Sequence, residues 1–202
     1  MTRILVLHSV NLLGSALTAL LRAEGAFEVA HAAWPGAEQE AESLRPDVCV
    51  VDADCPGAAA VLDRDRPART GVLGRGAALL VLATPDRPGS LRRAFQAQAH
   101  GYVDKDGPAG RLVQAVHKVA GGGRSVDASL ASALLENHAE PLSRRERSVL
   151  ARAADGDSVA EIAHALHLAR GTVRNYIASA SRKVGARNRV DAIRICRQAG
   201  WV

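Results

Sequence analysis

Length and composition limit what this chain is. It has 202 residues, of which 48% are hydrophobic, 23% charged and 3% aromatic. This profile is typical of a globular protein of one or two domains and excludes a disordered or fibrous chain. No apolar run approaches the roughly 18 to 20 residues of a membrane span, and the apolar start of the chain ends at His8-Ser9, before a signal core could form. We therefore expect a cytoplasmic protein with no membrane segment.

The charge is unevenly distributed. Residues 1–139 carry 14 Lys and Arg against 15 Asp and Glu, whereas residues 140–202 carry 12 against 6. The formal net charge of +5 therefore comes from the last third of the chain. Such asymmetry indicates a C-terminal module that binds a polyanion and an N-terminal part with a different function. A solvated basic face on a protein that binds no nucleic acid is the alternative.

The cysteines do not indicate a framework or a metal site. Cys49, Cys55 and Cys196 form an odd set without a C-x-x-C pair. Neither a disulfide scaffold nor a zinc site is expected from such spacing. We expect buried or incidental thiols, no metal and no cofactor.

Over the first 120 residues, short apolar runs rich in Val, Ile and Leu alternate with stretches of helical period. This alternation predicts an α/β domain with a parallel sheet. A first helix is indicated by leucines at i, i+4, i+7 and i+8 from Leu13, which place one face on the sheet. The expected strands are Ile4–Leu7, Glu28–Ala32, Val48–Val51, Leu79–Leu82 and Gly101–Val103, and the further helices are Ala37–Leu44, Ser90–Ala99 and Pro108–Ala120.

The segment between the third and fourth strands is expected to be irregular. Pro56-Gly57 opens it, and one proline and three glycines follow before residue 77. These residues leave little room for regular structure. They are Pro67, Gly71, Gly74 and Gly76.

Three glycines mark the end of this part. Gly121–Gly123 end its last helix and begin a linker, in which a short helix fits Asp127–Glu136. Pro141 closes the linker. We therefore divide the chain into an α/β, flavodoxin-like (βα)5 domain over residues 1–121, a linker over 122–140 and an all-α domain over 141–202.

Four helices fit the last 61 residues, with no strand between them. Ser143 and Glu146 form a capping box that starts the first of them. Apolar residues at i, i+3, i+4 and i+7 from Val159 define the second, and a three-residue turn leads into a third helix over Arg170–Val184. Two helices joined by a tight turn predict a helix-turn-helix.

The third helix carries the side chains that fit DNA. Arg donates two hydrogen bonds to guanine and Asn pairs with adenine, so Arg174 and Asn175 are the predicted base readers. Other residues on this helix are expected to bind phosphates, which sets register and salt dependence but not sequence. They are Arg170, Thr172, Arg182 and Lys183. An ordinary four-helix domain with a basic face is the alternative.

Five separated motifs follow one another in this region, namely Leu142–Glu146, Gly156, Glu161–Ala163, Gly171–Tyr176 and Arg182–Arg189. In order and spacing they resemble the LuxR-type DNA-binding domain over nearly all of 142–202. In that family the final helix, here about Asn188–Ala199, often mediates dimer contacts, which implies a homodimer on symmetric half-sites of double-stranded DNA. Ala178 lies where many relatives carry Lys or another polar contact residue, so we expect thinner direct readout.

Two stretches of the N-terminal part resemble the receiver domain of response regulators. They are Arg45–Asp52 followed by Pro56-Gly57, and Gly101–Asp106. With its C-terminal part, the whole chain resembles a NarL/FixJ-group response regulator of a two-component system. In that family the residues that match Asp52 and Lys105 are the phosphoacceptor and the lysine that contacts the phosphoryl group.

The phosphotransfer chemistry needs more than these two residues. A carboxylate that attacks a phosphoryl donor needs Mg²⁺, which prefers carboxylate oxygens. Receivers supply an acidic pair after the first strand, and this chain has His8-Ser9 there. An imidazole and a hydroxyl are poor substitutes for two carboxylates around Mg²⁺.

The switch hydroxyl is altered as well. The family's Thr or Ser after the fourth strand is replaced by Ala83, and Thr84 follows one residue late. The aromatic Tyr102 remains. We therefore expect an atypical receiver, whose pocket comprises His8, Ser9, Asp52, Thr84, Tyr102 and Lys105.

These features predict a DNA-binding transcriptional regulator that is not an enzyme. Its activity is expected to depend on a constitutive dimer, on a small ligand in the altered pocket or on a regulatory protein, instead of on standard Mg²⁺-dependent phosphorylation. Two alternatives stay open. One is a conventional response regulator phosphorylated at Asp52, and the other is a heterodimerising interaction module that inhibits another regulator.

Overall fold

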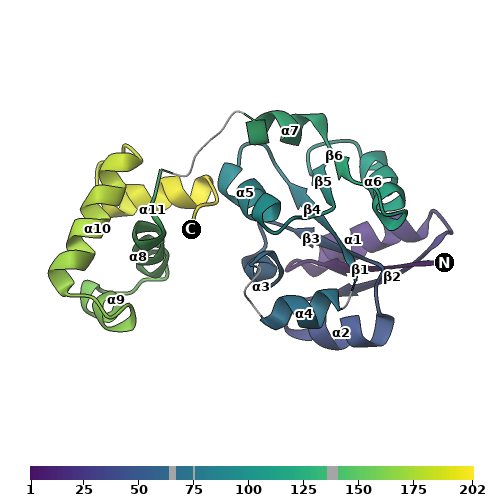
Figure 1. Ribbon diagram of the computed structural model, residues 1–202, viewed down its shortest axis with the longest axis horizontal. Coiled ribbons are helices and arrows are strands. Elements are labelled where there is room, and N and C mark those ends of the chain that lie inside the picture. Colours follow the sequence, from purple (N-terminus) through teal and green to yellow (C-terminus); the bar gives the residue numbers. More distant parts are fainter. Residues whose placement is uncertain (64–66, 75, 136–140) are drawn as a thin grey trace. The chain divides into compact units, whose positions relative to one another are not determined.

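The computed structural model describes residues 1–63, 67–74, 76–135 and 141–202 (Figure 1). Contacts within the chain divide it into two compact units, the first made chiefly of residues before 136 and the second chiefly of residues after 140. Within the described ranges, every helix is too short or too polar to cross a bilayer.

The first unit is built on a parallel sheet of six strands in the order β2-β1-β3-β4-β5-β6. The alternation of apolar runs and helical stretches therefore predicted the fold class correctly. The sixth strand is an addition that the sequence did not indicate. The strands are β1 (Thr2–Leu7), β2 (Phe27–Ala32), β3 (Val48–Asp52), β4 (Ala78–Ala83), β5 (Gly101–Asp104) and β6 (Ser125–Val126).

Successive residues of the central strands face two separate cores, as the period of two requires. Leu5, Cys49 and Leu79 face one core and Ile4, Val48 and Leu80 face the other, all at most 1% exposed. Two helices cover the second face, α1 (Asn11–Arg22) and α6 (Gly110–Ala120). The first face is covered by α2 (Ala37–Leu44), α3 (Ala59–Leu62), α4 (Pro67–Leu73), α5 (Pro88–Gln96) and α7 (Ala128–Leu135).

The prediction of an irregular segment between β3 and β4 is wrong. A 3₁₀ turn over Pro56–Ala58 leads into α3, and α4 follows. Pro67 is tolerated because it is the first residue of α4, where its missing N–H has no partner in the helix. Gly74 ends this stretch with a φ of +55°. Residues 64–66 and 75 lie outside the described residues.

Much of the segment predicted as linker belongs to the first unit. β6 pairs with β5, and Leu130 of α7 is fully buried in the core of this unit. Asp104 anchors the segment, because the Ser129 hydroxyl donates to Asp104 Oδ2 at 2.6 Å and the Asp104 amide donates to Asp127 Oδ2 at 2.8 Å. Residues 136–140 lie outside the described residues, and the boundaries at 121 and 141 stay a proposal.

Over residues 141–202, the second unit contains four helices, as predicted: α8 (Arg144–Ala154), α9 (Val159–Ala165), α10 (Arg170–Lys183) and α11 (Arg189–Gln198). The capping box at Ser143 and Glu146 is confirmed, and a second box at Ser158 and Glu161 starts α9. Such boxes satisfy backbone donors of the first turn. Buried apolar side chains of all four helices form the core of this unit.

Candidate functional site

Three polar side chains meet at the carboxyl edge of the sheet. His8 follows β1, Asp52 ends β3 and Lys105 follows β5. The strand order reverses between β1 and β3, and the carboxyl ends of parallel strands beside such a reversal are where open α/β sheets bind ligands. His8 and Asp52 are only 5% and 7% exposed.

Lys105 is held by two carboxylates. Its Nζ lies 3.0 and 3.2 Å from the two oxygens of Asp52 and 2.6 Å from Oδ2 of Asp54. Burial by itself would lower the pKa of Lys105, but the hydrogen bonds to Asp54 and Asp52 outweigh it and raise the pKa above its usual value. The motif predicts Lys105 beside Asp52, whereas Asp54 as the second partner of Lys105 is not predicted from the sequence.

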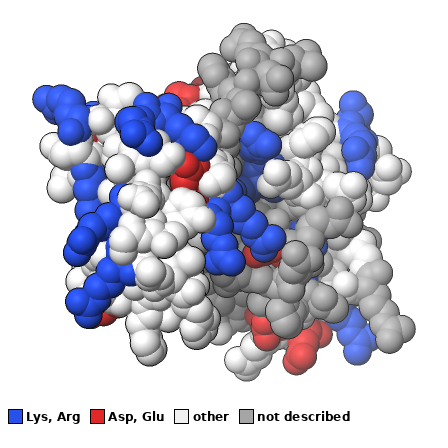
Figure 2. Space-filling view, turned by 60° about the vertical axis from the view of Figure 1, so that its left-hand side comes forward, with Lys and Arg blue, Asp and Glu red and all other residues white. Residues whose placement is uncertain are grey.

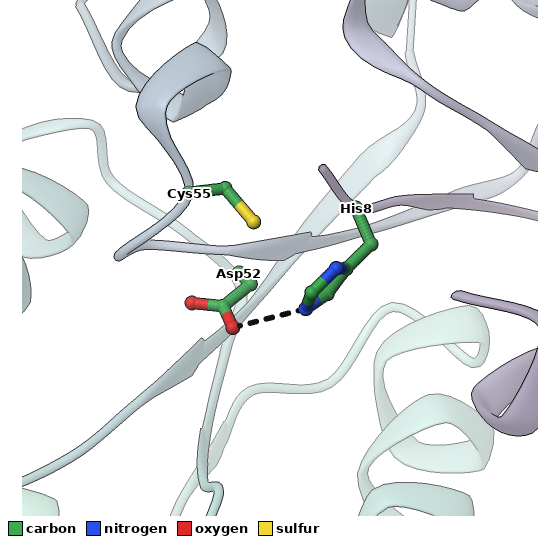
Figure 3. Close-up of side chains that lie close together, drawn as sticks. All are labelled: His8, Asp52 and Cys55. Atoms are coloured by element: carbon green, nitrogen blue, oxygen red, sulfur yellow. Dashed lines mark ion pairs between the residues drawn. The ribbon is translucent and has the colours of Figure 1, made fainter. Parts of the chain in front are cut away.

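His8 points at the same carboxylate. Its Nε2 lies 3.4 Å from Oδ2 of Asp52 (Figure 3), and its Nδ1 accepts a hydrogen bond from the Val10 amide at 2.9 Å. A ring nitrogen that accepts a hydrogen bond carries no proton, so the neutral ring bears its proton on Nε2. His8 therefore presents an N–H to Asp52.

Ser9 turns to other partners. Its hydroxyl accepts a hydrogen bond from Trp34 Nε1 at 3.1 Å, and its amide donates to the Cys55 sulfur at 3.4 Å. Cys55 lies in the turn after β3, and its sulfur joins the side chains of His8 and Asp52 in one cluster. Cys55 is not among the predicted pocket residues, although its position three residues after Asp52 is a signal for its presence there.

Thr84 and Tyr102 do not line the space beside Asp52. The amide of Lys105 donates to the carbonyl of Ala83 at 3.0 Å, and the buried Thr84 hydroxyl has no hydrogen-bond partner among the described residues. Tyr102 is 5% exposed, and its hydroxyl donates to the carbonyl of Ala94 at 3.3 Å. Burial raises the pKa of Tyr102. Of the six predicted pocket residues, the structure brings His8, Asp52 and Lys105 together.

A cavity of about 360 Å³ opens beside these three residues. Its other walls are mostly apolar and come from α1, from the strands and from the start of α6. Cavities of this size and character take small molecules. The apolar lining is Leu13, Ala16, Leu17, Leu20, Leu82, Val103, Pro108, Ala109 and Leu112.

In the second unit, α9 and α10 form the predicted helix-turn-helix. The turn closes through the Leu168 amide, which donates to the carbonyl of Ala163 at 2.8 Å, and His167 adopts a φ of +53°. Val173 and Ala180 of α10 are fully buried against the other helices. The opposite side of α10 therefore faces solvent.

The predicted DNA contacts lie along this solvent-facing side. Arg174, Asn175 and Ala178 are exposed, as are Arg170 and Arg182 at either end, and Thr172 is half-buried. The side of the helical unit that Figure 2 turns forward carries more Lys and Arg than Asp and Glu. These side chains can reach a groove and its phosphates together.

Lys183 has a partner inside the protein. Its Nζ lies 2.7 Å from Oε2 of Glu146, which also accepts from the Ser143 amide at 2.7 Å, and Ser179 donates to Oε1 at 2.7 Å. Burial alone would raise the pKa of Glu146, but these hydrogen bonds, that from Lys183 first, hold it at about 2. Lys183 thus ties α10 to α8, which the sequence analysis, treating Lys183 as a phosphate contact, did not foresee.

A second carboxylate fixes α11. Asp191 accepts hydrogen bonds from Arg194 at 2.8 Å and from the Arg187 amide at 3.1 Å, which hold its pKa at about 2. Arg189 donates to the carbonyls of Ala153 and Asp157 and so joins α11 to the end of α8. Several arginines of the basic unit are therefore structural.

The comparisons with known proteins agree with this division. Residues 140–196 match the family described as bacterial regulatory proteins, luxR family. The chain is 50% identical over 204 residues to the response regulator RamR of Streptomyces coelicolor, covering 100% of this chain and 98% of the relative. It is 34% identical over 203 residues to the transcriptional regulatory protein DesR of Bacillus subtilis, covering 100% and 99%.

Solved structures show the same architecture. The response regulator ChrA of a heme-sensing two-component system is 26% identical, with a TM-score of 0.53 over 99% of this chain and 98% of that one. RcsB from Salmonella enterica serovar Typhimurium, solved bound to a promoter, has a TM-score of 0.61 at 20% identity over 98% of each chain, which shows the fold alone.

Together, the parallel sheet with Asp52 and Lys105 at its edge and the helix-turn-helix define a two-domain DNA-binding regulator. The chain belongs to the response regulators with a LuxR-type DNA-binding domain, and it is a transcription regulator of that type.

Proposed function

We propose that this protein regulates transcription as a homodimer on symmetric half-sites of double-stranded DNA, and that its receiver works without Mg²⁺-dependent phosphorylation of Asp52. The observation that carries the proposal is the His8 ring, whose Nε2 lies 3.4 Å from Oδ2 of Asp52 at the place where receivers supply carboxylates. No catalytic turnover is part of this function.

The donor set beside Asp52 does not fit Mg²⁺. This ion requires oxygen ligands in near-octahedral geometry. His8 offers an N–H, the Ser9 hydroxyl is bonded to Trp34, and Asp52 and Asp54 share the ammonium of Lys105. We therefore derive no phosphotransfer step for this receiver.

Asp52 is also engaged on both of its oxygens. Oδ1 accepts from Lys105 at 3.0 Å and from the Asp54 amide at 2.8 Å, while Oδ2 faces Lys105 at 3.2 Å and His8 at 3.4 Å. A carboxylate held by hydrogen bonds and a buried ion pair is stabilised in place. This network supports a structural role for Asp52.

Control must then come from elsewhere. The apolar cavity beside His8, Asp52 and Lys105 supports a small-molecule ligand, and a constitutive dimer or a regulatory protein are the other modes that fit a receiver without phosphorylation.

Incubation with a small-molecule phosphodonor and Mg²⁺, followed by measurement of the intact mass, tests the proposal. We expect the wild-type protein to remain unmodified. Stoichiometric phosphorylation of Asp52 would contradict the proposal and favour the conventional alternative.

Introducing an acidic pair after β1 should allow Mg²⁺-dependent phosphorylation of Asp52. The double substitution His8→Asp and Ser9→Asp supplies two carboxylates after β1, and we expect it to acquire Mg²⁺-dependent phosphorylation at Asp52, measured by the same mass shift. The matched control adds Asp52→Ala to this variant and should abolish the shift. A double variant that folds, as judged by circular dichroism, binds Mg²⁺ and still stays unmodified would show that His8-Ser9 is not the cause.

On DNA, we propose that Arg174 and Asn175 read bases in the major groove, while Arg170, Thr172 and Arg182 bind phosphates. Lys183 can bind a phosphate only if its ion pair with Glu146 breaks. The competing function is an interaction module that heterodimerises with another regulator. The exposed and basic solvent side of α10 favours the DNA-binding function.

A further inference from the structure

Three side chains of different elements bring nitrogen, oxygen and sulfur donors to one point at the carboxyl edge of the sheet. His8 follows β1, Asp52 ends β3 and Cys55 lies in the next turn. The ligand atoms of all three lie within 4.8 Å of one another. Figure 3 shows the Cys55 sulfur and the His8 ring turned toward the space beside Asp52.

This donor set suits a transition metal. Imidazole nitrogen, thiolate sulfur and one carboxylate oxygen are the ligands that bind Zn²⁺, whereas Mg²⁺ prefers oxygen alone. Zinc bonds of about 2.0–2.3 Å in a tetrahedral site place ligand atoms roughly 3.5 Å apart. Shifts on the order of 1 Å would therefore close this cluster around an ion.

The local charge also calls for a cation. The side chains of Asp52 and Asp54 are 9% and 10% exposed, and both share the single ammonium of Lys105. Carboxylates at a buried edge are costly unless cations pair with them. A dication bound beside Asp52 would add to the pairing that Lys105 supplies.

We propose that this edge of the sheet binds a divalent transition metal of the zinc class through His8 Nε2, Asp52 Oδ2 and Cys55 Sγ, with water as the fourth ligand. Lys105 keeps its bond to Asp52 Oδ1, which is directed away from the site. This proposal rests on the proposed function in one respect, namely that the site at this edge of the sheet does not bind Mg²⁺ for phosphorylation of Asp52.

Metal binding changes the hydrogen bonds of His8. The ion takes the lone pair of Nε2, so the single proton of the neutral ring moves to Nδ1 and the Cys55 thiol releases its own proton. The Val10 amide can then no longer donate to Nδ1. Two N–H groups would then face each other, so the His8 ring or the Val10 amide has to shift when the ion binds.

Alkylation of the thiols tests the site. Cys55 is half-buried, while Cys49 and Cys196 are fully buried, so an alkylating reagent should modify Cys55 first. We expect one equivalent of Zn²⁺ to slow this modification at least about tenfold, because a metal-bound thiolate is withdrawn from reaction, and Mg²⁺ to leave it unchanged. Peptide mass spectrometry identifies the modified residue.

The matched variant is His8→Asn. Its side-chain oxygen can still accept from the Val10 amide, but it removes the nitrogen ligand, so Zn²⁺ protection of Cys55 should disappear. His164→Asn, on the exposed side of α9, should keep full protection. In the wild type, the amide resonance of Val10 should shift on addition of Zn²⁺.

Unchanged alkylation of wild-type Cys55 with Zn²⁺, or equal protection in His8→Asn, would overturn the zinc site. Either result leaves the proposed function intact if the phosphodonor also fails to modify Asp52. Phosphorylation of Asp52 with Mg²⁺ would remove the proposed function, whatever the Zn²⁺ experiment gives.

Discussion

Replacing Glu146 with Ala is expected to lower the free energy of unfolding of the helical unit by about 2–4 kcal/mol. Glu146 is 4% exposed and accepts hydrogen bonds from Ser143, Ser179 and Lys183. The substitution removes the capping box of α8 and the tie to α10, and it leaves the Ser143 amide without its partner. Denaturant unfolding followed by circular dichroism measures the loss.

The same residue predicts how stability depends on pH. The pKa of Glu146 is about 2 in the folded protein, against 4.5 ordinarily, because Lys183 and the other donors outweigh the effect of burial. A lowered carboxyl pKa gives stability that is fully present above the unfolded value and is lost as the pH falls toward the folded one. Wild-type stability should therefore decline between about pH 4.5 and pH 2.

Glu161→Ala is the matched control. Glu161 forms the equivalent capping box at α9, but it is exposed, and among the described residues no lysine or arginine forms an ion pair with it as Lys183 does with Glu146. The control should cost much less stability than Glu146→Ala. Equal losses for the two substitutions would show that the capping boxes alone, and not the buried ion pair, explain the effect.

Arg174→Ala is expected to weaken binding to the specific site by about 1–3 kcal/mol, or roughly five- to 150-fold, and to relax specificity at one base pair. Arg174 is exposed on the solvent side of α10, and a bidentate contact with guanine is the strongest specific contact available to it. Fluorescence anisotropy with the selected site and with single-base variants measures both quantities.

Arg170→Ala provides the contrast. As a phosphate contact it should weaken binding to all sequences to a similar degree and reduce the slope of log affinity against log salt by about 0.9. Equal affinity of Arg174→Ala and wild type for the specific site would show that Arg174 does not read a base.

Local patterns predicted most of the fold. The apolar runs place β1 to β5 within one or two residues of their observed bounds, and the box at Ser143 and Glu146 starts α8 as expected. β6 has two residues and α3 has four, and segments this short show no recognisable periodicity of apolar residues. α7 looks like linker from sequence because its burial depends on the sheet edge that it covers.

The site could be predicted only where a motif indicated the residue. Asp52, which ends β3, and Lys105, which follows β5, belong to a recognisable motif, and they do lie together. The second partner of Lys105, Asp54, and the partner of Lys183, Glu146, follow from side-chain geometry that sequence spacing does not encode. Tyr102 matches its motif, but its ring is buried in the core. Its hydroxyl donates a hydrogen bond to the carbonyl of Ala94 in α5.

The most direct test of the account is the effect of beryllofluoride with Mg²⁺ on DNA binding and on oligomeric state in solution. The full-length wild type and Asp52→Ala are compared, each with and without this phosphoryl mimic. Because the donors beside Asp52 do not fit Mg²⁺, we predict the same DNA affinity and the same oligomer in all four samples. Dimerisation and tighter DNA binding that require both the mimic and Asp52 would contradict the account and establish a conventional phosphorylated receiver.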